Sequence, residues 1–460
     1  MNDKKGLTIE RYFTKESMNV YDMFEYEKSS VDILDDDGKK QFAQNVEFPK
    51  NWNYLPKQIV ASKYFYGEQE TLERENSIKQ LIGRVSDTFY DWALKQNYFS
   101  SKENAINFRE ELVHISIDQK SSFNSPVWFN VGTHKISKDK PGDQKEAYII
   151  DNGKVQKIPL GKDREYPQTS ACFIQRVDDT MEGIMQLAKN EALLFKYGSG
   201  TGTNLSTLRS SHEKLSGGGK PSGPLAYWAF FDKVAGIVKS GGKTRRAAKM
   251  NILNIWHPDI LNFIESKRKE EEKLHILFDS GIPYKEAQDS VNYQNTNIAV
   301  RVNDNFMEAV EKNDEWKTIP VHNKEMADKM PKFNSRGLLI KIAESNWKCG
   351  DPGIQYHDVI NKWHTCPNSA SIDASNPCSE YMFVDDSSCN LASVNLLKFL
   401  NKDESFNIDG FNSTVKTIAI AQDLEIDNSS FPTEKIAENS HKFRPLGMGY
   451  ANLGALVMKL

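Results

Sequence analysis

The chain has 460 residues, of which 38% are hydrophobic and 11% aromatic, and this composition excludes a disordered protein. Its 59 Lys and Arg residues nearly balance its 63 Asp and Glu residues, so a net charge of −4 argues against a protein that binds nucleic acid through overall basicity. No apolar run approaches the roughly 20 residues that cross a bilayer, and the first residues carry no secretory signal, so we expect a cytoplasmic protein that binds no membrane.

The predicted elements change character along the chain. Residues 1–50 are polar and carry an acidic run at 32–37, so we expect them to form a loosely structured arm. Residues 51–122 are predicted to form a helical domain, because apolar residues within 78–89 and 108–117 recur at helical spacing.

Residues 123–460 are predicted to form an α/β domain. Short apolar runs alternate with segments of helical periodicity, which is typical of strands connected by helices. The lysine-rich stretch 135–168 interrupts this pattern, and we interpret it as a peripheral hairpin insertion. Residues 444–460 follow an apolar, helical pattern without a closing cap, so we expect the chain to stop inside a domain. The apolar runs are 172–177, 298–302 and 391–396, and the helical segments between them include 181–195 and 304–310.

The pentapeptide Asn376-Pro377-Cys378-Ser379-Glu380 is the most informative local motif. Proline restricts the residue before it to extended geometry and opposes a helix, so we expect a strand end or a loop tip. In an extended chain, Asn376, Cys378 and Glu380 would share one side and Ser379 would face the other. A nearby carboxylate disfavours a thiolate, so the pattern favours chemistry of a neutral S–H group or a sulfur radical. An ordinary loop cysteine beside an unrelated Glu is the alternative interpretation.

Two further cysteines, Cys172 and Cys389, each stand at the start of a predicted buried strand. They could meet as a redox pair, but cysteines that only pack in a core are common, so both interpretations stay open. The chain has five cysteines, no secretion signal and no CxxC spacing, so we expect neither a structural disulfide framework nor a metal site.

Three glycine-rich stretches invite a phosphate-binding interpretation. In Gly198–Asn204, Thr203 stands where the dinucleotide fingerprint requires its third glycine, and the stretch 236–244 misses the glycine spacing of a P-loop by one residue. What remains is a basic loop, 240–246, that can offer backbone N–H and guanidinium groups to a nucleotide. The stretch 217–219 is a second mobile loop or a plain surface loop.

Several segments, taken together and in this order, resemble the catalytic subunit of the ribonucleotide reductases, and most closely the adenosylcobalamin-dependent class. Several motifs that agree in order are far more specific than any one of them. The resemblance implies an N-terminal helical domain followed by a ten-stranded α/β barrel with a central finger loop, an incomplete barrel here because its closing strands would lie beyond residue 460. The matching segments are 123–132, 170–179, 191–219, 237–263, 294–310, 376–396 and 444–456.

The resemblance also implies the chemistry. Enzymes of this family reduce ribonucleotides to 2′-deoxyribonucleotides with a thiyl radical, here on Cys378, that takes the 3′ hydrogen of the ribose. Glu380 would be the general base on the 3′ hydroxyl, and Asn376 would hydrogen-bond the sugar. Cys172 and Cys389 would be the redox pair that reduces the 2′ position and ends as a disulfide.

The implied ligands are adenosylcobalamin with its cobalt, a ribonucleoside di- or triphosphate substrate, a thioredoxin- or glutaredoxin-type reductant, and a dNTP or ATP effector; a homodimer is possible. Alone, the chain is expected to be inactive, because the substrate phosphate turn and a C-terminal thiol pair would lie beyond its end. A nucleotide-binding regulatory module is the alternative function. Residues implied near the substrate are Ser125, Ser170, Ala171 and Gly202, and those implied around the effector are Asp179, Arg209, Lys243, Arg245 and Arg246.

Overall fold

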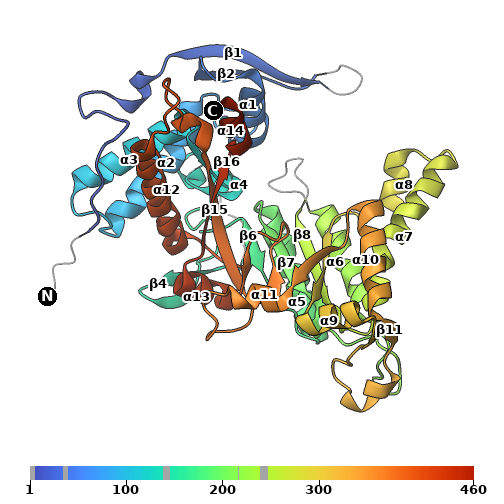
Figure 1. Ribbon diagram of the computed structural model, residues 1–460. Coiled ribbons are helices and arrows are strands. Elements are labelled where there is room, and N and C mark those ends of the chain that lie inside the picture. The colour runs from blue at the N-terminus through green and yellow to red at the C-terminus, as the bar shows by residue number, and fades with distance from the viewer. Residues whose placement is uncertain (1–5, 35–39, 138–145, 216, 239–246) are drawn as a thin grey trace. The chain divides into compact units, whose positions relative to one another are not determined.

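The computed structural model describes residues 6–34, 40–137, 146–215, 217–238 and 247–460 (Figure 1). Its contacts divide the chain into two compact units. The split unit consists of Met1–Ala171 and Ser388–Leu460, and the central unit consists of Cys172–Ser387. The boundaries expected at residues 50 and 122 do not coincide with this division.

An antiparallel hairpin opens the split unit. Its strands are β1 (Tyr26–Leu34) and β2 (Lys40–Pro49). Val31, Val46 and Phe48 are buried in one core with the helices that follow. The expectation of a loosely structured arm is therefore wrong for these strands, because alternate apolar residues give the hairpin a face that it can bury.

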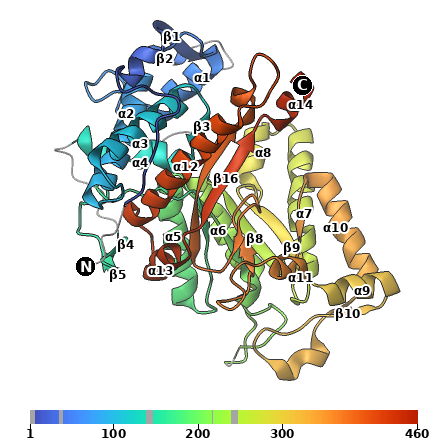
Figure 2. The same ribbon diagram turned by 60° about the vertical axis from the view of Figure 1, so that its left-hand side comes forward.

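The helical region predicted for residues 51–122 is confirmed. Ser77 caps the long helix α2 together with Gln80 in a capping box, and the apolar residues at helical spacing, such as Leu81 and Phe89, face the core. Helices α2 and α3 pack against each other and against α12, as Figure 2 shows. The helices are α1 (Tyr54–Ile59), α2 (Ile78–Lys95), α3 (Lys102–Ile117), α4 (Ser125–Asn130) and α12 (Ile408–Asn428).

Strand β15 (Ser387–Asn395) organises the rest of the split unit. It pairs with β3 (Ser121–Phe123) in antiparallel and with β16 (Leu446–Ala451) in parallel orientation. The helical pattern expected for residues 444–460 is thus wrong over β16. A Cβ on Gly447 would lie 2.3 Å from Leu391 Cδ2, so this glycine lets the two strands pack closely. The remaining elements are the predicted hairpin β4 (Tyr148–Asp151) with β5 (Lys154–Lys157), and the helices α13 (Glu434–Phe443) and α14 (Leu453–Lys459).

The central unit is built on a parallel sheet. In the described residues its strands follow the order β12, β9, β8, β7, β6, and helices connect them, which confirms the α/β prediction. The strands are β6 (Cys172–Ile174), β7 (Gly200–Asn204), β8 (Lys249–Asn254), β9 (Asn297–Val302) and β12 (Gly353–Tyr356). The connecting helices are α5 (Met181–Lys196), α6 (Pro224–Ile237), α7 (Ile260–Asp279), α8 (Tyr284–Ser290), α9 (Asp304–Lys312) and α10 (Ser335–Cys349).

The two faces of this sheet differ. On β9, Ile298, Val300 and Val302 join the core beneath the helices, so Ala299 and Arg301 point to the other face. A short hairpin lies against that other face; its strands are β13 (Ala374–Ser375) and β14 (Met382–Phe383). Two hydrogen bonds link it to the sheet: Arg301 donates to Gln355, and Gln355 donates to Ser375. Within the described ranges, no helix is long and apolar enough to span a membrane.

Glu425 of α12 provides a test of this core. Its side chain is fully buried, and neither carboxylate oxygen has a hydrogen-bond partner among the described residues. Burial raises the pKa of Glu425 well above its usual value. The folded state therefore holds a proton that the unfolded chain loses above about pH 4.3, and the stability contributed by this group falls as pH rises beyond that point.

We expect Glu425→Gln, which keeps the shape and removes the ionisation, to gain free energy of unfolding relative to wild type between pH 5 and pH 7. The gain is about 1.4 kcal/mol for each pH unit above the unfolded pKa, until the pH reaches the folded pKa. Urea denaturation of both proteins across this pH range measures it. A difference between the two proteins that does not change with pH would contradict the neutral buried carboxyl.

Candidate active site

The predicted pentapeptide forms the tip of the β13–β14 hairpin. The N–H of Asn376 donates to the carbonyl of Tyr381 at 3.1 Å, and the N–H of Ser379 donates to the carbonyl of Asn376 at 3.2 Å. Ser379 adopts a left-handed φ of 64°, so the tip is a tight turn. The loop tip is thus confirmed, but the extended geometry inferred from Pro377 ends at Asn376.

Two glycines of β7 allow the hairpin to approach the sheet. A Cβ on Gly202 would lie 1.7 Å from the carbonyl oxygen of Ser375, and one on Gly200 would lie 2.9 Å from Pro377 Cγ. No side chain fits between the two backbones at Gly202. Gly200–Asn204 is therefore a fully buried strand that supports the hairpin, and the role of Gly202 near the substrate stays a prediction.

The turn brings together three of the predicted catalytic side chains. Asn376 Nδ2 lies 2.5 Å from Glu380 Oε1 and 3.0 Å from Cys172 Sγ, and the Cys172 thiol donates to the same Glu380 oxygen at 3.5 Å. The amide oxygen of Asn376 accepts the N–H of Tyr381 at 3.0 Å, which fixes the orientation of the amide. Asn376 and Cys172 are buried, whereas Glu380 is exposed. An amide, a thiol and a carboxylate thus converge at the foot of the turn.

Cys378 differs from Cys172 in its exposure. It is exposed at the tip and lines a cavity of about 330 Å³ within the central unit. Asn297 lines the same cavity and donates from Nδ2 to the carbonyl of Pro377 at 3.1 Å. Cys349 also lines it, although its position in the sequence gave no sign of this. Cys378 therefore borders a space that a small molecule can enter.

Buried polar groups beneath the hairpin hold the turn. Gln355 donates from Nε2 to Ser375 Oγ at 2.8 Å and to Ser379 Oγ at 3.2 Å. Arg301 is fully buried, donates to Gln355 at 3.0 Å and donates to the carbonyl of Ile372; burial lowers its pKa to about 10. Sequence reasoning missed both residues. An arginine within the apolar run 298–302 was the available signal, because a buried cation needs polar partners.

The residues expected around an effector are only partly described. Asp179 Oδ2 lies 2.5 Å from Arg209 Nε, and Arg209 also contacts the Asp179 carbonyl at 3.4 Å. These two predicted residues are therefore neighbours at one surface of the central unit. Lys243, Arg245 and Arg246 lie outside the described residues.

The other predicted residues lie in the split unit. Ser125 Oγ is 3.0 Å from the hydroxyl of Tyr64, and Ser170 Oγ is 3.2 Å from Ser388 Oγ. The N–H of Ala171 donates to the carbonyl of Cys389 at 3.2 Å, and the Cys389 side chain is buried. Cys172 and Cys389 thus belong to different units, and their pairing stays a prediction.

Comparisons with known proteins place the chain in a family. Residues 170–460 match the model of the ribonucleotide reductase barrel domain, which is more than half of the chain. The chain belongs to the ribonucleotide reductase family. Residues 27–119 match the model of class II vitamin B12-dependent ribonucleotide reductase.

The family relatives are longer than this chain. The vitamin B12-dependent ribonucleotide reductase of Rhodopirellula baltica is 50% identical over 462 residues, which cover 99% of this chain and 44% of the relative. The corresponding protein of Streptomyces avermitilis is 46% identical over 99% of this chain and 45% of its own length. A vitamin B12-dependent ribonucleoside-diphosphate reductase of Thermoplasma acidophilum is 28% identical over 97% of this chain and 54% of the relative. The chain thus spans about half the length of these relatives.

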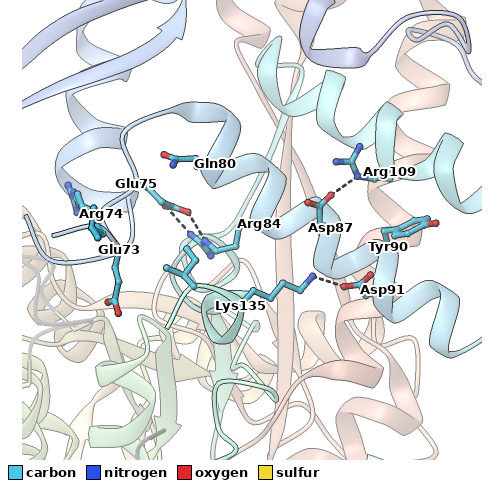
Figure 3. Close-up of a pocket in the computed structure, with 12 residues that line it drawn as sticks. Glu73, Arg74, Glu75, Gln80, Arg84, Asp87, Tyr90, Asp91, Arg109 and Lys135 are labelled. Carbon is cyan, nitrogen blue, oxygen red and sulfur yellow. Dashed lines mark hydrogen bonds and ion pairs between the residues drawn. The ribbon is translucent and has the colours of Figure 1, made fainter. Parts of the chain in front are cut away.

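A second cavity, of about 730 Å³, lies in the split unit, and no residue of the β13–β14 hairpin lines it (Figure 3). Its charged side chains neutralise one another. Figure 3 shows the pairs that Arg84, Arg109 and Lys135 make with Glu75, Asp87 and Asp91, respectively. An anionic ligand that used these three cations would have to break their pairs, so they are poorly suited to bind a nucleoside triphosphate.

We expect Gly202→Ala to displace the hairpin, because its Cβ would lie 1.7 Å from a backbone oxygen that cannot rotate away. The cost is about 1 to 3 kcal/mol of stability or more. Hydrogen exchange at the amides of Asn376 and Tyr381 reports the displacement. Gly353→Ala is the matched control, since its nearest heavy atom is 3.9 Å away. Equal protection in both variants would show that the close approach does not hold the hairpin.

Proposed function

We propose that the protein acts within a ribonucleotide reductase and converts ribonucleotides to 2′-deoxyribonucleotides by thiyl-radical chemistry. The observation that carries the proposal is the tip at which Cys378 is exposed while Asn376, Glu380 and Cys172 converge behind it. The relatives are named as vitamin B12-dependent ribonucleotide reductases, which supports the same reaction. The finer architecture that we propose is a ten-stranded barrel with the β13–β14 hairpin as its central finger loop, to which this chain contributes the described strands.

The proposed role of each side chain follows from the hydrogen atom, proton or hydrogen bond that it can give or accept. Cys378 carries the sulfur radical that takes the 3′ hydrogen of the ribose and later returns it. Glu380 accepts the proton of the 3′ hydroxyl at a carboxylate oxygen, and the Asn376 amide orients that carboxylate through the 2.5 Å contact. The same amide fixes the Cys172 sulfur at 3.0 Å, so acid, amide and thiol reach the sugar from one side.

Loss of the 2′ hydroxyl as water requires two electrons and two hydrogens. Cys172 and Cys389 supply them as their two S–H groups become one disulfide, so a ribonucleotide and two thiols give a deoxyribonucleotide, water and a disulfide. A thioredoxin- or glutaredoxin-type dithiol then reduces the disulfide for the next turnover. The Cys172 thiol already donates to Glu380 at 3.5 Å, which gives its proton a path toward the reacting sugar.

The chemistry of the exposed thiol fits the cofactor of this class. When bound, adenosylcobalamin would supply the radical chemistry that removes the hydrogen atom of the Cys378 thiol and leaves the unpaired electron on its sulfur. The residues that would face its reactive part line the cavity around Cys378, where Asn297 and Ser379 offer polar groups and Met250 offers apolar surface. Cys172 and Cys389 are buried, so the exposed Cys378 is the sulfur best placed for this role.

We further propose that a dNTP or ATP effector binds at Asp179 and Arg209, with Lys243, Arg245 and Arg246 as additional contacts, and that a homodimer is the working assembly. Effector binding would alter the affinity for the substrate, which is a coupling between two distinct sites. If this chain bound effectors and never supported turnover, it would instead be a nucleotide-binding regulatory module.

The test supplies the chain with a C-terminal piece from a full-length relative, adenosylcobalamin and a thioredoxin system. We expect Cys378→Ala to lower deoxyribonucleotide formation by more than about a thousandfold, because the reacting sulfur is gone. Cys366→Ala removes a thiol of the same unit that does not line the cavity, and should retain activity. Turnover that survives Cys378→Ala would refute the radical mechanism at this residue.

We expect Cys172→Ser and Cys389→Ser each to abolish repeated turnover with thioredoxin, since a serine cannot close the disulfide. Product formed per enzyme over time measures this loss. An unchanged steady-state rate in either variant would remove that cysteine from the redox pair and leave the role of Cys378 untouched.

A further inference from the structure

Residues 318–323 form an anchored segment beside the Asp179 cluster. It follows β10 (Glu315–Lys317), which pairs with β11 (Lys332–Asn334). The N–H of Ile319 donates to the carbonyl of Trp256 at 2.8 Å, and the Thr318 hydroxyl donates to the carbonyl of Pro331 at 2.6 Å. These contacts hold the start of the segment next to Trp256 and Pro331.

A buried carboxylate holds the other end of this segment. Glu213 accepts the backbone N–H groups of Val321, His322 and Asn323 at 3.1, 2.8 and 2.8 Å, and that of Ser210 at 2.9 Å. Burial raises the pKa of Glu213, but the backbone N–H groups outweigh it and leave this pKa below its usual value. Because Ser210 follows Arg209 in the chain, one carboxylate fixes both Arg209 and His322 relative to Asp179.

His322 makes direct contact with Asp179. Its Nε2 lies 2.8 Å from Asp179 Oδ2, the same oxygen that Arg209 Nε contacts at 2.5 Å. A carboxylate oxygen can only accept, so His322 Nε2 carries the proton in this contact. Asp179 Oδ1 has no hydrogen-bond partner among the described residues, whereas Oδ2 has both. The carboxylate therefore presents one saturated oxygen and one open acceptor.

We propose that His322 is a positioning residue of the effector site, which fixes Asp179 so that Oδ1 stays open to accept a hydrogen bond from the nucleotide effector. This inference rests on the proposed function, because it presumes that the effector binds at Asp179. His322 acts through Asp179 and is held in place by Glu213. A carboxylate fixed before binding loses less conformational entropy when the ligand arrives, so the contact increases effector affinity.

The experiment measures dATP and dTTP binding to the full 460-residue chain by isothermal titration calorimetry. We expect His322→Ala to raise the dissociation constant about tenfold, because it removes one charge-assisted hydrogen bond to Asp179. His322→Gln should bind within about twofold of wild type, since its Nε2 can still donate to Oδ2. His275→Ala is the matched control, an exposed histidine of α7 that contacts Glu271. A positioning role predicts that His322→Gln restores dNTP binding and that wild type and both variants have equal thermal unfolding midpoints. A merely structural role would lower the midpoint of His322→Ala.

Asp179→Ala tells the two possible failures apart. If this variant loses dNTP binding while His322→Ala binds as wild type does, the effector site stands and the role of His322 is overturned. If wild type binds neither dNTP, or Asp179→Ala binds as tightly as wild type, the proposed effector site fails and the role of His322 fails with it. Weak binding in both His322→Ala and His322→Gln would also overturn the inference, because the donor at Nε2 would then not matter.

Discussion

The close approach of the β13–β14 hairpin to β7 is the constraint on which the site depends. At Gly202 the two backbones leave no room for a Cβ. Any side chain there would push the hairpin outward by more than 1 Å, given that such contacts require roughly 3.4 Å. A hydrogen bond does not survive a displacement of that size. The contacts of Asn376 with Cys172 and Glu380, at 3.0 and 2.5 Å, therefore depend on Gly202, which takes part in neither hydrogen bond.

The hairpin is fastened by directed hydrogen bonds, because its short strands bury little apolar surface. Arg301 donates to Gln355, and Gln355 donates to the hydroxyls of Ser375 and Ser379, so one buried chain of donors holds both ends of the turn. A partly satisfied chain of this kind would cost free energy, whereas a satisfied one selects a single geometry. Hydrogen-atom transfer needs such fixed geometry, because its rate falls steeply when the reacting atoms are misplaced.

The sequence predicted the elements whose pattern is local. Helical spacing located α2 and α5, and apolar runs located β6, β9 and β15, because each depends on which face is buried. The errors arose where tertiary packing decides. Gly447 lies in β16, where it lets the strand pack closely on β15, and no local pattern contains that neighbour. The convergence of Asn376 and Glu380 was expected from strand alternation but arises from the turn at Ser379.

The resemblance pointed to Asp179, yet His322 could not be found in the same way, since more than a hundred residues separate the two positions. The fold links them through Glu213, whose carboxylate binds backbone N–H groups and so leaves no side-chain signature in residues 321–323. Residues 172–179 form one continuous segment that begins with β6 at Cys172 and ends at Asp179. Within it, the backbone N–H of Gln175 donates a hydrogen bond to the carbonyl of Gly202 at 3.0 Å. The segment between Cys172 and Asp179 thus makes a backbone contact with the glycine strand beneath the hairpin. Whether the proposed effector and catalytic sites are coupled through this segment is measured by the coupling energy between their two ligands.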